Sequence, residues 1–230
     1  MSRITQLHEG LELLSEGDPP RHSLFVLGRV LGQADQLLVV DPPEDLAERF
    51  TLPQQAAVLF TGPALSVDVP LLETLPGDAA HVSIGPHLLD IHAQQFHRVV
   101  YLPALGILWG GGFGSDLTVP EIAEGSSGDD ELETLRLLAR LLKGRRVELY
   151  IPRTGSLVRD RVEVMGRLAE DVGYLHGLRR VIPAAARRGE ALERIEQMAA
   201  TLLPENRRTQ EGWRVHDRNV QRLFAASSTL

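Results

Sequence analysis

Histidines are the side chains in this sequence that are best suited to metal binding or acid–base chemistry. Four of them, His81, His87, His92 and His97, fall within seventeen residues. Their separations of six, five and five residues match neither one face of a strand nor adjacent turns of a helix. We therefore expect solvated or hydrogen-bonded histidines at strand ends, and no shared metal ion.

The glycine-rich stretch from Gly110 to Gly114 is a second candidate, because glycine lets the backbone approach a neighbouring group closely. It lacks the Lys-Ser/Thr pair and the helix start of a phosphate-binding loop. We expect a packed corner or the edge of a site instead. Ser23, Ser66 and Ser83 have no Gly-x-Ser-x-Gly context, so a serine nucleophile is not indicated.

Charged side chains of the second half are predicted to lie mainly in solvent. Glu163, Glu170 and Asp171 share one predicted helix with several arginines, which is typical of a solvated face. Arginine doublets occur near predicted helix ends, where cations offset the helix dipole or meet water. These doublets are Arg179-Arg180, Arg187-Arg188 and Arg207-Arg208. Few aromatic residues accompany them, so nucleic acid is not favoured as a partner.

The composition describes an ordinary globular protein. With 230 residues, 43% of them hydrophobic, the chain can bury a substantial core. It contains no cysteine, which excludes disulfides, thiolate catalysis and zinc–thiolate sites and fits a reducing compartment. No run of about eighteen apolar residues occurs. We expect a cytoplasmic protein that neither spans a membrane nor is secreted.

Charge is distributed unevenly along the chain. Residues 1–135 hold 5 basic and 20 acidic side chains, a net of −15, whereas residues 136–230 carry a net of +8. This asymmetry predicts either ion pairs across the fold or a bipartite surface that meets a charged partner or another copy of the chain.

The predicted elements put strands first and helices last. A hairpin of strands at 98–102 and 107–109, closed by a tight turn, leads into the glycine run. The other predicted strands are 22–30, 36–40, 56–60, 80–84, 87–91 and 147–151. The predicted helices are 43–50, 131–142, 156–178, 184–203 and 212–226. We expect one domain over 1–230 with a helical extension from about 184, and a mobile acidic loop at 121–130.

Several phrases, in this order, resemble the metallo-β-lactamase fold superfamily. LLVVDPP resembles the family's strand that ends in Asp, and AAVLFTGPALSVDV the strand that leads into its His-x-His-x-Asp-His loop. FHRVVYLPALGILWGGG resembles the segment with the third histidine and the bridging Asp, and RRVELYIPRTG the segment with the last histidine. WRVHDRNVQRLF resembles the closing helix. The resemblance implies a four-layer αββα sandwich with mixed sheets and C-terminal helices.

Carried over residue by residue, this resemblance implies a metal site that has lost its ligands. The family's first four ligand positions, two histidines, an Asp and a histidine, are occupied here by Gly62, Ala64, Ser66 and Val67. The position of the bridging Asp is occupied by Gly112, and that of the last histidine by Thr154. The third histidine is either His97 or, counted back from Tyr101-Leu102-Pro103, Ala93 beside His92. Asp41 remains, at a position that orients the family's site. Zinc needs at least three converging donors, so His97 is only a residual metal candidate.

The sequence therefore favours a non-catalytic member of this fold, acting as a binding or scaffold module. We expect no catalytic residues, no metal and no cofactor. We expect the partner to be a small molecule or a protein. The charge asymmetry also allows a homo-oligomer, in which the acidic part of one copy meets the basic part of another. The alternative is a divergent hydrolase of the superfamily that has relocated its metal ligands.

Overall fold

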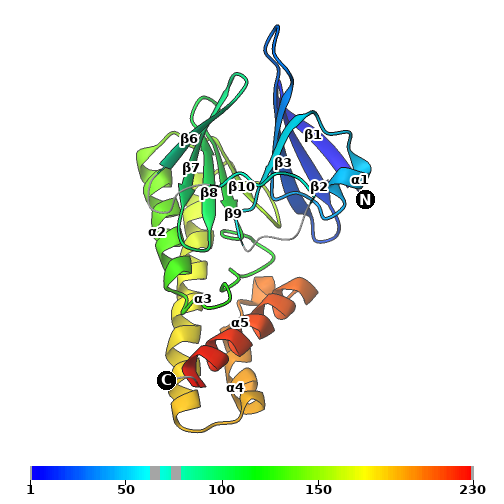
Figure 1. Cartoon of the computed structure of the whole chain (residues 1–230). Helices are drawn as coiled ribbons and strands as arrows, with labels where there is room; N and C mark the ends of the chain where they lie inside the picture. Colours follow the sequence, from blue (N-terminus) through cyan, green and yellow to red (C-terminus); the bar gives the residue numbers. More distant parts are fainter. Residues whose placement is uncertain (1, 63–67, 74–78, 229–230) are drawn as a thin grey trace.

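Two five-stranded sheets face each other in the computed structural model (Figure 1), which describes residues 2–62, 68–73 and 79–228. The first sheet has the order β1-β2-β3-β4-β5, and the second has the order β10-β9-β8-β7-β6. Leu24 and Leu38 of the first sheet and Ile91 and Val100 of the second belong to one buried cluster between the sheets. The predicted sandwich is confirmed.

The first sheet is built from the first 59 residues. Its strands are β1 (Ser2–His8), β2 (Leu11–Glu16), β3 (Arg21–Gly28), β4 (Gln36–Val40) and β5 (Gln55–Leu59). β1 to β4 are antiparallel neighbours, and β5 runs parallel to β4. The sequence predicted β3, β4 and β5 but not the β1–β2 hairpin, because β1 is an edge strand whose side chains are mostly exposed and polar.

The second sheet contains the hairpins that the sequence predicted. Its strands are β6 (Ala79–Ile84), β7 (His87–Ala93), β8 (Arg98–Leu102), β9 (Ile107–Gly111) and β10 (Leu149–Pro152). β10 is parallel to β9, and the other neighbours are antiparallel. Side chains alternate along β8, so that Val100 faces the first sheet whereas Val99 and Tyr101 face the helices.

The helices are α1 (Leu46–Arg49), α2 (Asp129–Gly144), α3 (Arg161–Arg187), α4 (Leu192–Ala199) and α5 (Gln210–Ser228), with 3-10 turns at Ala200–Leu202 and Glu205–Arg207. α2 and α3 lie against the second sheet, and α4 and α5 pack on the part of α3 that extends beyond it (Figure 1). Leu138 of α2 and Leu178 of α3 pack in one cluster with Leu108 of β9. Over the first sheet, the helical layer in the described residues is the short α1, whose Leu46 joins Val39 and Phe60.

The predicted boundaries of the helices at 156–178 and 184–203 were wrong, since α3 covers Arg161–Arg187 and α4 covers Leu192–Ala199. α2 begins at Asp129, two residues earlier than predicted, after Gly128 in the left-handed region, and the Asp130 side chain accepts hydrogen bonds from the backbone N–H groups of Gln95 and Phe96. α3 begins after Asp160, which accepts from the Val162 N–H at 2.8 Å. It continues through Pro183, where a break was predicted, and the packing of Leu178, Ile182 and Ala185 in the helical core offsets the backbone hydrogen bond that the proline removes.

Ion pairs join the acidic first part of the chain to the basic second part. Arg179 lies 2.6 Å from Asp129, and Arg222 lies 2.9 Å from Glu121. These contacts favour the first explanation of the charge asymmetry, internal pairing. The prediction that Asp171 and Arg207 lie in solvent was wrong: both are fully buried and form an ion pair with each other. Asp171 lies in α3 and Arg207 lies in the 3-10 turn before α5, 36 residues further along the chain.

Candidate functional site

A cleft lies where β4, β9 and β10 end, between the sandwich and α5. It consists of a hollow of about 500 Å³ and a second of about 300 Å³. Arg21, Glu44 and Arg153 line both hollows, so the two are adjacent. The volume of the first is in the range of small-molecule sites.

A short backbone ladder closes the sandwich at this cleft. The His22 N–H donates to the carbonyl of Arg153 at 2.7 Å, and the Gly155 N–H donates to the carbonyl of Pro20 at 3.0 Å. Arg21 and Thr154 form the β-bridge between these two bonds. The Arg153 N–H donates to the Gly111 carbonyl at 2.7 Å. The backbone of Arg153 is therefore held by hydrogen bonds to both sheets.

The glycine run forms both a packed corner and the edge of the cleft. A β-carbon on Gly110 would overlap the hydroxyl of Tyr150, which donates to the Phe113 carbonyl at 2.8 Å. Gly111 has a φ of 60°, and a β-carbon there would lie 2.7 Å from the Thr61 hydroxyl. Gly112 lines the cleft itself. The predicted close approach is confirmed at these positions.

The guanidinium of Arg153 lies against two of the positions that the resemblance assigns to metal ligands. A β-carbon on Gly62 would lie 3.4 Å from Arg153 Nη1, and one on Gly112 would lie 3.8 Å from Nη2. Thr154, a third such position, follows Arg153 directly and lines the second hollow. Ala64, Ser66 and Val67 are outside the described residues. A fixed positive charge thus borders the space between Gly62 and Gly112.

Asp41 lies at the bottom of the cleft and is fully engaged by hydrogen bonds. It is buried and has a φ of 49°. Its carboxylate accepts from the Thr61 N–H at 2.8 Å, from Trp109 Nε1 at 2.9 Å and from the Thr61 hydroxyl. Ser23 donates to its carbonyl at 2.7 Å. These bonds tie β4 to the end of β5 and to β9, so Asp41 is a structural carboxylate in this chain.

His22 is the histidine that lines the cleft within the described part of the chain. Its Nε2–H donates to the Gly155 carbonyl at 2.7 Å, and its Nδ1 accepts from the Ser15 hydroxyl at 2.8 Å. Burial lowers the pKa of His22, which favours the neutral ring that this pattern requires. Both ring nitrogens are already used, and no motif around this histidine distinguished it in the sequence.

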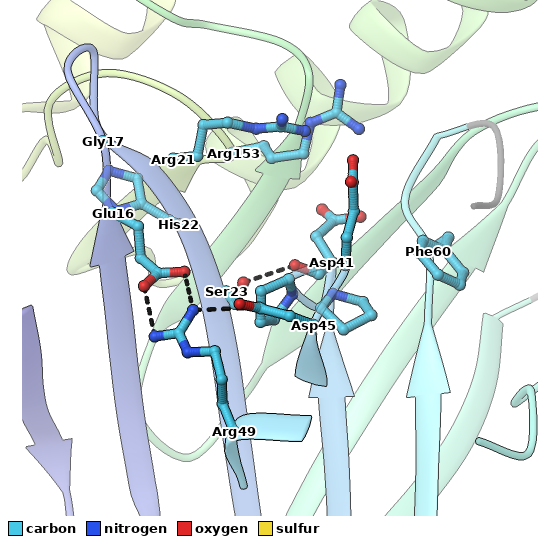
Figure 2. A pocket seen from close by; sticks show the side chains of 13 residues that line it. Glu16, Gly17, Arg21, His22, Ser23, Asp41, Asp45, Arg49, Phe60 and Arg153 are labelled. Atoms are coloured by element: carbon cyan, nitrogen blue, oxygen red, sulfur yellow. Dashed lines mark hydrogen bonds and ion pairs between the residues drawn. The ribbon is translucent and has the colours of Figure 1, made fainter. Parts of the chain in front are cut away.

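Charged side chains of the first hollow divide into a paired group and an unpaired group. Arg49 binds Glu16 at 2.6 Å and Asp45 at 3.2 Å (Figure 2). Figure 2 also shows the Arg21 and Arg153 side chains extending over the same end of the pocket. Neither guanidinium has a hydrogen-bond or ion-pair partner within residues 2–62, 68–73 and 79–228.

The second hollow is lined by arginines of α5 that do have partners. Arg214 binds Glu211 at 2.5 Å, while Arg218 and Arg222 both bind Glu121, at 3.3 and 2.9 Å. These three arginines share two carboxylates, so this wall of the cleft carries a net charge of about +1. The two guanidinium groups without a partner among the described residues lie at the junction of the two hollows.

His97, the residual metal candidate, lies outside the cleft. It is buried, and its Nε2 donates to Glu131 Oε1 of α2 at 2.9 Å. The same carboxylate accepts from the Ala123 N–H at 2.8 Å and the Ser126 hydroxyl at 2.6 Å. Burial raises the pKa of Glu131, but the hydrogen bonds from His97, Ser126 and Ala123 outweigh it and leave the pKa below its ordinary value. His97 thus helps to fasten the acidic loop at 121–130, which was expected to be mobile.

The other three histidines of the predicted group do not converge. His81 Nδ1 lies 2.7 Å from Asp90 across the β6–β7 pair, and His87 is next to His8 at the far end of the sheets. His92 has a buried Nε2 without a partner, and burial lowers its pKa. Within the described residues, no group of three or more His, Cys, Asp or Glu side chains is placed to hold a metal ion.

Among the described residues, the cleft therefore offers no set of side chains that fits a metal ion. Gly62 and Gly112 offer no donor side chain, while Asp41 and His22 have their donors and acceptors engaged. The Arg153 guanidinium adds electrostatic repulsion against a divalent cation. We also note that no helix in the described part of the chain could cross a membrane.

Comparison with solved structures shows that the chain has the metallo-β-lactamase fold. A metallo-β-lactamase family protein from Thermus thermophilus superposes with a TM-score of 0.58 over 95% of this chain and 93% of its own, at 13% identity. A β-lactamase domain protein from Burkholderia ambifaria has a TM-score of 0.58 over 96% and 87%, at 14% identity. The metal-soaked Flv1 flavodiiron core from Synechocystis sp. PCC6803 has a TM-score of 0.54 over 85% and 74%, at 13% identity. No protein-family model and no curated protein matches the sequence.

Proposed function

We propose that this chain is a non-catalytic binding protein that holds a small molecule in the cleft without a metal ion. The observation that carries the proposal is the position of Arg153, whose guanidinium borders Gly62 and Gly112, two positions that the resemblance assigns to metal ligands. An arginine side chain is a permanent cation, so it can attract an anionic ligand where a metal would otherwise do so.

An arginine cannot replace the chemistry of a metal ion in hydrolysis. Metal-dependent hydrolysis uses a bound ion that lowers the pKa of water from about 15.7 to about 7. A guanidinium does not coordinate water through a vacant orbital, and the two buried titratable side chains of the first hollow, His22 and Asp41, are engaged in structural hydrogen bonds. Ligand binding is therefore the function that this donor set supports best. We also propose a cytoplasmic location, on the absence of cysteine.

The test combines metal analysis with activity assays on the full chain. After dialysis against zinc, manganese and iron and then against buffer, we expect less than stoichiometric metal by elemental analysis. We also expect no metal-dependent hydrolysis of ester, thioester or phosphodiester substrates. His22→Asn and His97→Ala serve as matched variants, one at the cleft and one away from it. A tightly held ion that is lost in either variant, together with hydrolysis, would restore the relocated-ligand hydrolase.

A further inference from the structure

We infer that the junction of the two hollows binds the phosphate group of a small organic phosphate monoester, through the guanidinium groups of Arg153 and Arg21. This inference deepens the proposed binding function and rests on it. The residues concerned are brought together by the backbone ladder between β3 and the end of β10, where Arg21 is bridged to Thr154, the residue after Arg153.

The first argument is that these two cations have no counter-ion among the described residues. Arg49, Arg214, Arg218 and Arg222, which also line the cleft, each bind a carboxylate. Arg21 and Arg153 bind none in that part of the chain, although both line the same cavity. Arg153 is half-buried, with a backbone fixed by two hydrogen bonds of 2.7 Å. A half-buried guanidinium on a fixed backbone is preorganised to bind an oxyanion through two parallel N–H groups.

The second argument concerns the charge of the ligand. Two unpaired guanidinium groups supply two positive charges, and a phosphate monoester carries about −1.5 to −2 at pH 7. A carboxylate or a sulfate monoester carries only one negative charge. Glu44 lines both hollows and has no partner in the described residues. Its carboxylate can accept a hydrogen bond from a hydroxyl of the ligand but repels a second anionic group, which favours one phosphate per ligand.

The third argument concerns the rest of the ligand. The first hollow has about 500 Å³, and Pro42, Pro43 and Phe60 contribute apolar surface to it. The second hollow has about 300 Å³ and is lined largely by paired ions. A ligand whose phosphate lies at the junction would therefore place its organic part in the first hollow, where apolar contact is available.

Gly112 offers a sharp test, because a carboxylate placed there would lie next to the proposed phosphate-binding cation. Among the described residues, a β-carbon at Gly112 meets only Arg153 Nη2 within 4 Å, at 3.8 Å, so Gly112→Asp should be accommodated and should pair with Arg153. Gly112→Asn has the same shape without the charge and is the matched control. Arg153→Gln removes the cation directly.

Binding is measured by calorimetry and by thermal shift, with phenyl phosphate, phenyl sulfate and inorganic phosphate as probes. We expect the wild type to prefer phenyl phosphate to phenyl sulfate, which has the same shape and one charge less. Arg153→Gln and Gly112→Asp should each weaken phenyl phosphate binding about 10- to 100-fold, whereas Gly112→Asn should retain most of it. Circular dichroism and melting curves establish that each variant is folded.

The outcomes separate this inference from the proposed function. Equal binding of the two phenyl esters, or an unchanged affinity in Arg153→Gln, would overturn the phosphate site. A second outcome is that phenyl phosphate does not bind, whereas an uncharged or monoanionic compound from a thermal-shift panel binds equally well to the wild type and to Arg153→Gln. This outcome would refute the phosphate site and leave the binding function standing. Metal-dependent hydrolysis would refute the binding function, whatever the result with Arg153→Gln.

Discussion

Replacing Glu131 with glutamine should lower the free energy of unfolding at pH 7 by about 1.5–3 kcal/mol, the contribution of hydrogen bonds to a charged group. Glu131 is fully buried and accepts from His97, Ala123 and Ser126. Glutamine keeps the shape of the side chain but removes the charge and replaces one acceptor with a donor. For a chain of this size, the melting temperature should fall by roughly 3–12 °C.

The pH dependence of this effect follows from the direction of the pKa shift. The pKa of Glu131 is lower in the folded protein than in the unfolded chain, where it is about 4.3. Its contribution to stability is therefore fully present above about pH 4.3 and is lost as the pH falls through the folded-state pKa. The difference in unfolding free energy between wild type and Glu131→Gln, measured by urea denaturation, should be constant from about pH 6 to 8 and should shrink in the acid range.

Two further variants make this test specific. Glu133→Gln, on the same helix but with a side chain 48% exposed, should change the stability by less than about 0.5 kcal/mol. His97→Ala should also be destabilising, and a double-mutant cycle with Glu131→Gln should give a coupling of about 0.5–3 kcal/mol. A Glu131→Gln protein as stable as the wild type at pH 7, or a cycle without coupling, would show that this buried pair does not stabilise the fold.

Two other substitutions test the packed corner and the buried ion pair. Gly110→Ala should lower the free energy of unfolding by about 3 kcal/mol or more, because its methyl group would overlap the Tyr150 hydroxyl. Gly166→Ala, at an open position on α3, should raise it by up to about 1 kcal/mol. Denaturant titration compares the two variants, and equal effects would contradict the overlap. Arg207→Met should cost about 3–5 kcal/mol, because it leaves the carboxylate of Asp171 buried without its cation. The added change Asp171→Asn should recover part of this loss in melting temperature, and a double variant no more stable than Arg207→Met would argue against the uncompensated charge.

The sequence predicted those parts of the fold in which local pattern and tertiary packing agree. The β8–β9 hairpin has two apolar strands that are buried almost throughout, a tight turn with Gly106 at a φ of 63°, and a following glycine run. All of these signals lie in one stretch of sequence. The order of such stretches was enough to indicate the fold. β1 was missed because an exposed edge strand has little hydrophobic pattern.

The site could not be predicted in the same way, because its contacts join distant residues. Arg153 is held in the cleft by backbone hydrogen bonds to His22 and Gly111, which are distant in sequence. His97 has a structural role because it donates to Glu131, which lies 34 residues further along the chain. Asp171 and Arg207 were assigned to solvent since charged residues at helical spacing usually lie there, yet they are buried together. In each case the charge pattern was visible in the sequence, but the partner was not.

The metal-free binding function proposed above requires that the cleft keep its shape by other means, and the hydrogen bonds around Arg153 and Asp41 provide them. A metal ion whose ligands come from several loops ties those loops together and contributes to folding free energy. Here protein hydrogen bonds connect the same strand ends: Asp41 joins β4 to Thr61 and Trp109, and the backbone of Arg153 joins β10 to His22 and Gly111. The guanidinium itself is not needed for these backbone bonds. It is therefore free to bind an anion, and Arg153→Gln should reduce ligand binding while leaving the melting temperature of the free protein nearly unchanged.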